Sequence, residues 1–162
     1  MNRVERGLPV LLLPTVSAAG PRDLMVPVAA VEQILSAASL EPPTPGAPDW
    51  LAGLLPWRGL RVPVVCLGQG ADPAAGRPAA RPYVVLCRAP TGAPVLPYFA
   101  LASPSLPRLE RVTPRTLSPD PAAVEAPGRP FSVVALRHQG QPAVLLDPDA
   151  LQRALLAASG LS

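Results

Sequence analysis

The chain has 162 residues, of which 49% are hydrophobic and 15% charged, and this balance excludes a disordered polar chain. All 14 basic residues are arginines scattered along the sequence, so the net charge of +3 does not predict a nucleic-acid partner. The 25 prolines remove backbone hydrogen-bond donors and end helices, which favours short strands joined by many turns.

The N-terminal segment is expected to form a hairpin followed by a short helix. Residues 8–16 and 22–26 are two apolar runs separated by turn residues at Gly20-Pro21, which is typical of paired strands. Residues 28–35 then place apolar side chains at helical spacing, and Pro27 suits a helix start. The pattern predicts a short early helix over residues 28–35.

The same N-terminal run has some features of a secretory signal, because Arg3 and Arg6 precede apolar residues 8–13. Pro9 and Pro14 interrupt the run, however, whereas a signal sequence prefers an unbroken apolar helix. No stretch approaches the roughly 20 apolar residues that span a bilayer. We therefore expect a strand here, no membrane insertion and a cytoplasmic protein.

A proline-rich connector precedes the next pair of strands. Residues 41–48 contain four prolines and a glycine, which predicts an extended, polyproline-like segment. Asp49 can cap a short turn over residues 50–54. Apolar runs at residues 54–57 and 60–67 then predict two strands around a single Arg-Gly step.

The central part of the chain alternates loops with strands. Residues 68–81 are rich in Gly, Pro and Ala and predict a surface loop. Residues 82–88 and 95–102 predict two further strands joined by a turn. Residues 104–130 are irregular, and we expect a short strand near residues 108–112 within a long surface segment.

The C-terminal part predicts a hairpin and one helix. Residues 131–138 and 141–146 are apolar runs on either side of Gln139-Gly140. Asp147 is a good N-cap, and Pro148 suits the first position of a helix over residues 148–158. With eight to ten short strands in all, the spacing predicts an antiparallel barrel or sandwich.

No residue pattern predicts an active site, a metal site or a cofactor. Cys66 and Cys87 lie in apolar runs, where a free cysteine behaves as a small buried hydrophobe. His138 is the only histidine, and we expect it to be an exposed hairpin residue without a catalytic partner. Asp147 and Asp149 flank a helix start, where the helix dipole favours negative charge.

The candidate binding residues lie in the block from Gly53 to Val65. Gly59 can turn the chain with a positive φ, so that Arg58 stands at the tip of a hairpin. A planar, permanently charged guanidinium held there can bind carboxylates of a partner. Gly53 and Gly59 would allow close approach of a partner backbone. Trp57 favours an interface position, whereas Trp50 favours the core.

This block resembles the signature of CheW-like coupling domains, the adaptors that join chemoreceptors to a histidine kinase. In that family an apolar Gly-x-x-x-x-Arg-Gly turn leads into a Pro-Val strand that ends in an Asp-Leu pair. The matching residues here are Gly53, Arg58, Gly59, Pro63, Val64 and Leu67. Cys66 stands where the family usually has Asp, and Trp57 replaces a commoner aliphatic residue.

The resemblance is closest to the ChpC-like adaptors of type IV pilus chemosensory systems, in which an Asp-Trp-Leu step (here Asp49-Trp50-Leu51) precedes a similar Trp-Arg-Gly-Leu-Arg block. It extends weakly across nearly the whole chain. It implies a mainly β fold of two interleaved, SH3-like, five-stranded antiparallel barrels, with the short early helix and the C-terminal helix. It also implies a single domain over residues 8–158.

The function implied is a non-enzymatic adaptor of a chemosensory array that controls twitching motility. Its partners would be the regulatory domain of a CheA-like histidine kinase and the cytoplasmic tip of a methyl-accepting chemoreceptor, with Arg58, Gly59, Gly53 and Trp57 as partner-binding residues. Two alternatives stay open. One is a small ligand-binding or enzymatic barrel in which Arg58, Asp147 and His138 converge; the other is a degenerate CheW paralogue that sequesters partners.

Overall fold

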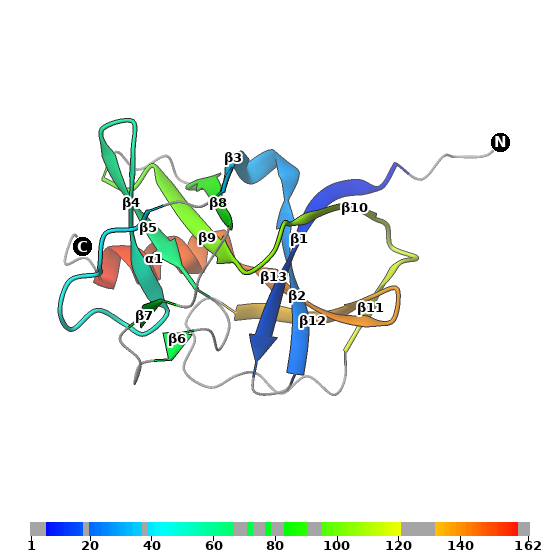
Figure 1. The fold of residues 1–162 in the computed structure, drawn as a ribbon. Coiled ribbons are helices and arrows are strands. Elements are labelled where there is room, and N and C mark those ends of the chain that lie inside the picture. Colours follow the sequence, from blue (N-terminus) through cyan, green and yellow to red (C-terminus); the bar gives the residue numbers. More distant parts are fainter. Residues whose placement is uncertain are drawn as a thin grey trace.

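The computed structural model describes residues 6–17, 20–36, 39–66, 71–72, 77–78, 83–90, 95–120 and 132–158. Two large β-sheets lie side by side, and the C-terminal helix packs against the five-stranded one (Figure 1). The mainly β architecture predicted from the sequence is confirmed.

One sheet has six strands in the order β10-β1-β2-β13-β12-β11. These strands are β1 (Leu8–Ser17), β2 (Gly20–Pro27), β10 (Arg108–Val112), β11 (Leu117–Pro119), β12 (Ser132–His138) and β13 (Gln141–Leu146). The predicted β1–β2 and β12–β13 hairpins are both present, the second with Gln139 and Gly140 at positive φ. β10 has the predicted bounds, whereas β11 was not predicted.

The second sheet has five strands in the order β3-β8-β9-β5-β4. These are β3 (Val31–Ser36), β4 (Leu51–Trp57), β5 (Leu60–Val65), β8 (Tyr83–Arg88) and β9 (Tyr98–Ser103). Two short strands, β6 (Ala71–Asp72) and β7 (Arg77–Pro78), pair separately. The rest of the loop predicted over residues 68–81 lies outside the described residues, as do residues 121–130 and Thr91 and Gly92 of the predicted Pro90-Thr91-Gly92 turn.

The two sheets are interleaved in the sequence, as expected. The chain forms β1 and β2, builds the five-stranded sheet, and returns to complete the six-stranded sheet with β10–β13. The two sheets differ in detail from the expected five-stranded antiparallel barrels. The first sheet has six strands, and β2–β13 and β5–β9 are parallel pairs. Long crossovers bring these partners together, and only such connections can join parallel strands.

The predicted early helix over residues 28–35 was wrong. Residues Val28–Ala30 form one turn of 3-10 helix, η1, and the chain then continues as β3. β3 pairs with β8 from Val31↔Cys87 to Ser36↔Tyr83. The β-branched side chains of Val31 and Ile34 suit a strand, and pairing with β8 outweighs the helical spacing of the apolar residues.

The turn predicted over residues 50–54 was also wrong, because β4 already begins at Leu51. The preceding connector is held to β4 by two backbone hydrogen bonds between Glu41 and Leu54, of 2.8 and 2.9 Å. Trp50 lies in the core, as predicted, with 7% of its surface exposed.

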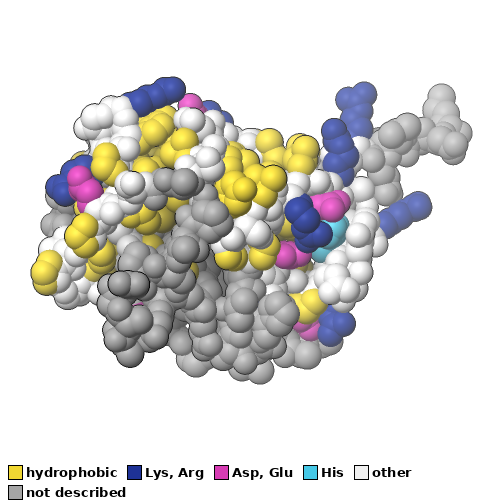
Figure 2. Space-filling view, viewed as in Figure 1, with side chains coloured by type: hydrophobic (Ala, Val, Ile, Leu, Met, Phe, Trp, Pro, Cys, Tyr) yellow, Lys and Arg dark blue, Asp and Glu magenta, His cyan; other side chains and the backbone are white. Residues whose placement is uncertain are grey.

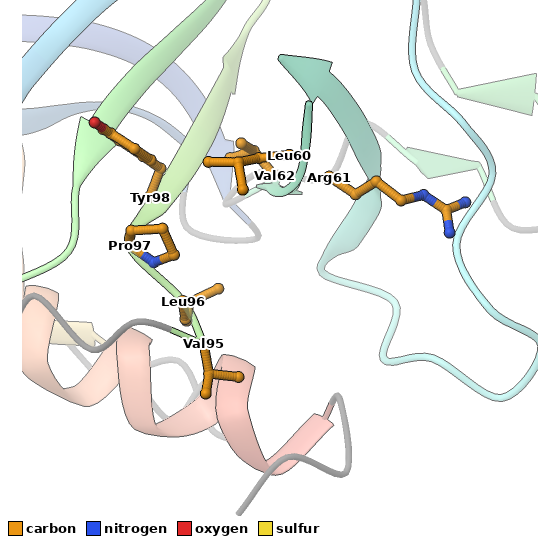
Figure 3. Close-up of a pocket in the computed structure, with 7 residues that line it drawn as sticks. All are labelled: Leu60, Arg61, Val62, Val95, Leu96, Pro97 and Tyr98. Carbon is orange, nitrogen blue, oxygen red and sulfur yellow. The ribbon is translucent and has the colours of Figure 1, made fainter. Parts of the chain in front are cut away.

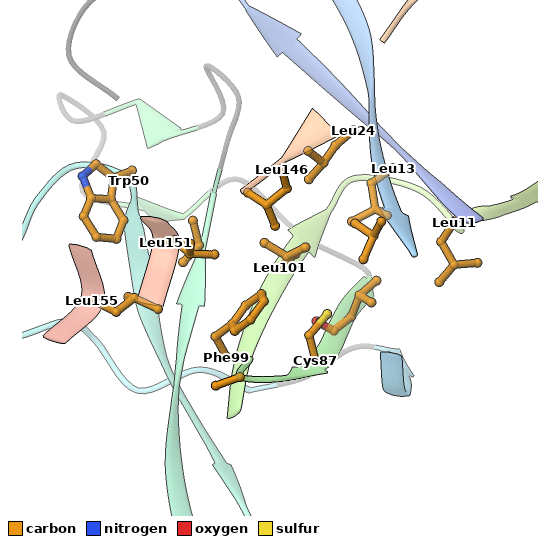
Figure 4. Close-up of a cluster of buried hydrophobic side chains, with 14 residues drawn as sticks. Leu11, Leu13, Leu24, Trp50, Cys87, Phe99, Leu101, Leu146, Leu151 and Leu155 are labelled. Atoms are coloured by element: carbon orange, nitrogen blue, oxygen red, sulfur yellow. The ribbon is translucent and has the colours of Figure 1, made fainter. Parts of the chain in front are cut away.

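The largest group of buried side chains lies between the two sheets and the helix (Figure 4). Leu11, Leu13 and Leu24 come from the six-stranded sheet, and Phe99 and Leu101 come from the five-stranded sheet. The helix α1 (Pro148–Ala158) contributes Leu151 and Leu155. This cluster therefore fixes the position of the five-stranded sheet relative to the rest of the molecule. Most buried side chains of the β4–β5 hairpin pack within that sheet in a separate cluster.

Asp147 caps α1 as predicted. Its Oδ1 atom accepts hydrogen bonds from the backbone N–H groups of Asp149 and Ala150, at 3.0 and 3.1 Å. These bonds satisfy two donors that would otherwise have no partner within the helix. The cap thus fixes the point at which the chain leaves β13 and enters the helix.

We expect Asp147→Ala to lower the free energy of unfolding by about 1 kcal/mol, the usual cost of losing an N-cap. Asp149→Ala is the matched control, because Asp149 lies in the first turn of the same helix but its carboxylate is exposed. Its effect should be a few tenths of a kcal/mol, from the helix dipole alone. Urea unfolding of both variants checks this, and equal effects would contradict the capping role.

Candidate interaction surface at the β4–β5 turn

The strands β4 and β5 are joined by a two-residue turn formed by Arg58 and Gly59. The pair Trp57↔Leu60 closes the hairpin, and φ is 46° at Arg58 and 77° at Gly59. Positive φ at both central residues matches the type I′ turn, whose twist fits that of the flanking strands. Gly59 adopts this conformation without steric cost. The tight turn predicted from the sequence is therefore present, with Arg58 exposed at its tip.

Arg58 stacks on the hairpin's own aromatic residue. The guanidinium carbon of Arg58 lies 4.5 Å from the centre of the Trp57 ring. Trp57 in turn contacts the Tyr98 ring edge to face, with ring centres 4.9 Å apart and an interplanar angle of 68°. Such contacts restrict the long arginine side chain while its N–H donors remain directed outward around the rim of the guanidinium.

Arg58 has no ion-pair partner within the described part of the chain. Other exposed arginines do have one: Arg61 pairs with Glu41, and Arg88 pairs with Glu32 at 2.9 Å. The Arg61 Nε atom donates to Glu41 at 2.7 Å, so the neighbouring positive charge is already satisfied internally. Arg58 is thus a preorganised cation that still has its carboxylate-binding capacity.

Gly53 lies away from this exposed tip. It is buried in β4 with φ of 154°, and a Cβ atom at this position would overlap the carbonyl oxygen of Glu41. The backbone that approaches Gly53 closely is therefore the chain's own connector. Gly59, in contrast, has open space where a Cβ would lie.

A small hollow opens beside the hairpin, where β5 and the segment leading into β9 diverge (Figure 3). The two strands pair only at Val64↔Ala100 and Val65↔Leu101. The hollow has a volume of about 140 Å³ and is lined by Leu60, Arg61, Val62, Val95, Leu96, Pro97 and Tyr98. The Arg61 side chain points away from the other lining residues, toward the connector (Figure 3).

Sequence reasoning did not identify this hollow. Leu60 and Val95 are more than thirty residues apart, and each is an ordinary apolar residue, Leu60 at the start of β5 and Val95 three residues before β9. The signal that marks the hollow is the exposure of large apolar side chains, with Leu60 40% exposed and Val95 55% exposed. This exposure can be seen only in the structure. Tyr98 links the hollow to Arg58, because its ring both lines the hollow and contacts Trp57.

The comparison with protein families gives the decisive observation: residues 15–155 match the CheW-like domain. The chain belongs to this family. The crystal structure of the scaffolding protein TtCheW from Thermoanaerobacter tengcongensis has the same fold, with a TM-score of 0.60, 12% sequence identity, and coverage of 87% of this chain and 89% of that chain. A comparison with curated proteins gives no match.

CheW-like proteins are non-enzymatic scaffolds of chemotaxis signalling, and this assignment confirms that the chain is an adaptor and not an enzyme. The three residues of the alternative enzymatic site are not brought together. Arg58 lies at the β4–β5 turn, whereas His138 ends β12 at the opposite end of the molecule (Figure 1). Asp147 is engaged in capping α1.

The prediction that His138 is exposed was wrong. Only 6% of its surface is exposed, and its Nε2 atom is buried without a hydrogen-bond partner. The short strand β11 pairs alongside, with Leu117 opposite His138. Because β11 was not predicted, the residue was expected to be exposed in the hairpin.

Cys66 and Cys87 are buried thiols that do not form a disulfide, in agreement with the sequence-based expectation. Cys87 is the fifth of the six residues of β8 and is completely buried. Burial raises the pKa of the Cys87 thiol to about 12, and the nearby Arg88 charge only partly opposes this increase.

Charged and apolar side chains are unevenly distributed over this CheW-like domain. In the view of Figure 2, apolar side chains gather over the half that contains the five-stranded sheet, and most charged side chains lie at its margin or on the other half. None of the helices in the described residues is long and apolar enough to cross a membrane.

Proposed function

We propose that this CheW-like protein couples a methyl-accepting chemoreceptor to a CheA-like histidine kinase in a chemosensory array of the cytoplasm. The observation that carries the proposal is Arg58, exposed at a rigid turn, stacked on Trp57 and without a carboxylate partner among the residues that the structure describes. A cation held in this way loses little side-chain entropy on binding. It therefore suits an acidic surface of a partner protein.

The mechanism is scaffolding by one rigid body with two interfaces. An edge of the sheets binds the CheW-like regulatory domain of the kinase, and the surface near Arg58 binds the helical hairpin tip of the receptor. Binding at one interface makes the second event intramolecular, which raises the effective concentration of the second partner. The core shared by both sheets keeps the two interfaces in a fixed relative position.

The proposed partner-binding residues have different roles. Arg58 contacts the partner directly, and Trp57 supports the guanidinium and adds aromatic surface. Gly59 holds the turn and leaves space for the partner backbone. Gly53 acts indirectly, because it admits the connector that braces β4.

We expect Arg58→Ala to weaken binding of the receptor hairpin by about 10-fold or more, in the range of an interfacial hot spot. Isothermal titration calorimetry with the cognate receptor hairpin and kinase regulatory domain measures this. Arg111→Ala is the matched control, since Arg111 is an exposed arginine of the other sheet that donates to the Gly7 carbonyl oxygen. Absence of binding of wild-type protein to either partner at tens of micromolar would refute the proposed function.

The finer assignment, to the ChpC-like adaptors of a type IV pilus system, rests on the Asp49-Trp50-Leu51 step before the Trp57-Arg58-Gly59 block. Deletion of the gene should then impair twitching motility and leave flagellar swimming unchanged. The reverse phenotype would assign the adaptor to a flagellar array.

Cys66 favours one other candidate, a degenerate paralogue that binds partners without coupling them. It replaces the Asp that the family usually has, and its side chain is buried. An in vitro kinase assay separates the two functions. A true adaptor raises receptor-dependent kinase activity, whereas a sequestering paralogue lowers it in proportion to its concentration.

A further inference from the structure

The tip of the β4–β5 hairpin extends beyond the strand pairing of its sheet. β5 pairs with β9 only at Val64↔Ala100 and Val65↔Leu101, so residues 60–63 of β5 lie outside this pairing. The tip accordingly projects from the five-stranded sheet (Figure 1). A two-stranded ribbon on its own is only marginally stable in water. The orientation of the turn that carries Arg58 therefore depends on side-chain contacts with the rest of the sheet.

Tyr98 makes a contact of this kind. It is the first residue of β9, and β5 lies between β9 and β4 in the sheet. The Tyr98 ring nevertheless reaches Trp57 at the end of β4, with ring centres 4.9 Å apart and an interplanar angle of 68°. Aromatic rings favour such edge-to-face contacts. Both rings also pack against buried side chains of the five-stranded sheet, so Tyr98 ties Trp57 to that sheet.

Trp57 in turn supports the Arg58 guanidinium. The guanidinium carbon lies 4.5 Å from the centre of the Trp57 ring, and no ion pair within the described part of the chain holds it elsewhere. An arginine side chain loses considerable rotational freedom when it binds a partner. A guanidinium that already rests on a fixed ring has less freedom to lose. The position of Trp57 therefore sets the direction in which Arg58 presents its N–H donors.

A direct contact with the partner is the alternative role for the Tyr98 ring. The ring is half-buried and already engaged by Trp57 and by the apolar side chains of its own sheet. These contacts favour an effect that is exerted through Trp57. The two roles differ when Arg58 is removed, because a positioning residue then has nothing to position, whereas a contact residue keeps its contact.

We propose that Tyr98 is a positioning residue: it holds the Trp57 ring, and through this ring it keeps the Arg58 guanidinium in the orientation that receives a carboxylate. The inference rests on the proposed function for the identity of the partner. It adds to that function a residue of another strand, which only the meeting of β5 with β9 brings near the turn.

Calorimetric titration with the cognate receptor hairpin tests the inference in solution. Tyr98→Leu should weaken binding by about 5-fold, which corresponds to the loss of one aromatic pair contact. Tyr98→Phe keeps the ring and should retain the affinity of the wild-type protein. Tyr83→Leu is the matched control and should leave the affinity unchanged. Tyr83 is also half-buried at a strand start in the same sheet, but it lies at the opposite end of the β8–β9 pair.

A double-mutant cycle shows whether Tyr98 acts through Arg58. In the Arg58→Ala background, Tyr98→Leu should cause no further loss of affinity. The same 5-fold loss in both backgrounds would overturn the inference, because Tyr98 would then contact the partner directly or merely support the fold. A loss in Tyr98→Phe as large as that in Tyr98→Leu would also overturn it, since the hydroxyl group and not the ring would be required.

A measurement on the free protein keeps the inference separate from the adaptor function. The NMR order parameter of the Arg58 Nε–H group, assigned by its disappearance in Arg58→Ala, should fall in both Tyr98→Leu and Trp57→Leu. It should stay unchanged in Tyr83→Leu. An unchanged order parameter in Tyr98→Leu would refute the positioning role even if the receptor hairpin binds. Absence of wild-type binding would instead refute the adaptor function, and the order parameter would still decide whether Tyr98 positions Arg58.

Discussion

Gly53→Ala should lower the free energy of unfolding by about 4 kcal/mol, although it adds only one methyl group. φ at Gly53 is 154°, which L residues rarely adopt, and the added Cβ would overlap the Glu41 carbonyl oxygen. Backbone strain costs about 1–3 kcal/mol and overpacking costs a similar amount. The clashing atom belongs to the backbone, so relief requires movement of the connector and loss of its two hydrogen bonds to Leu54.

Gly59→Ala is the matched control for this variant. φ at Gly59 is also positive, at 77°, but nothing lies within 4 Å of the position where its Cβ would be. It should therefore lose only the conformational part, about 1 kcal/mol. Equal losses for the two variants in urea unfolding would show that the connector gives way and that the close approach of Glu41 is not structurally required.

Arg61→Gln separates the connector's ion pair from its backbone bonds. Arg61 and Glu41 are both substantially exposed, with 68% and 39% of their side chains accessible, so their ion pair should contribute less than about 1 kcal/mol. The larger effect of Gly53→Ala is then assigned to the backbone contact. The glycine that the family signature contains at this position is thus explained by packing within the chain.

The parts of the fold that the sequence predicted are those with local causes. The β4–β5 turn was predictable because Gly59 is needed for its positive φ, and the capped helix was predictable because Asp147 and Pro148 mark its start. The resemblance to CheW-like domains added the interleaving of the two sheets, which spacing alone did not contain.

The parts that the sequence did not predict depend on partners distant in the chain. β3 had helical spacing, and only its pairing with β8, about fifty residues away, makes it a strand. His138 is buried because β11 pairs beside it, and a three-residue strand that ends in Pro119 carries almost no sequence signal. The hollow beside Arg58 likewise requires β5 and β9 to meet and diverge, which no local pattern specifies.

The second large effect is expected at alkaline pH and arises from the Cys87 thiol. Burial of its side chain in the core raises the pKa of Cys87 from 9.0 to about 12, because the thiolate would be removed from water. Below pH 9 the thiol is protonated in both the folded and the unfolded chain, so this group does not change the free energy of unfolding with pH there. Between pH 9 and pH 12 the unfolded chain loses this proton and the folded chain keeps it, which favours unfolding.

The expected loss is about 3 kcal/mol by pH 11 and approaches about 4 kcal/mol at pH 12, from about 1.4 kcal/mol for each pKa unit. Cys87→Ala is the control: it removes this thiol and keeps Cys66, both tyrosines and every arginine. The difference in unfolding free energy between wild type and Cys87→Ala, measured in urea from pH 8 to pH 11, should therefore shrink as the pH rises. Parallel curves would mean that the folded chain ionises Cys87 as readily as the unfolded chain, which is incompatible with a thiol sealed between the two sheets.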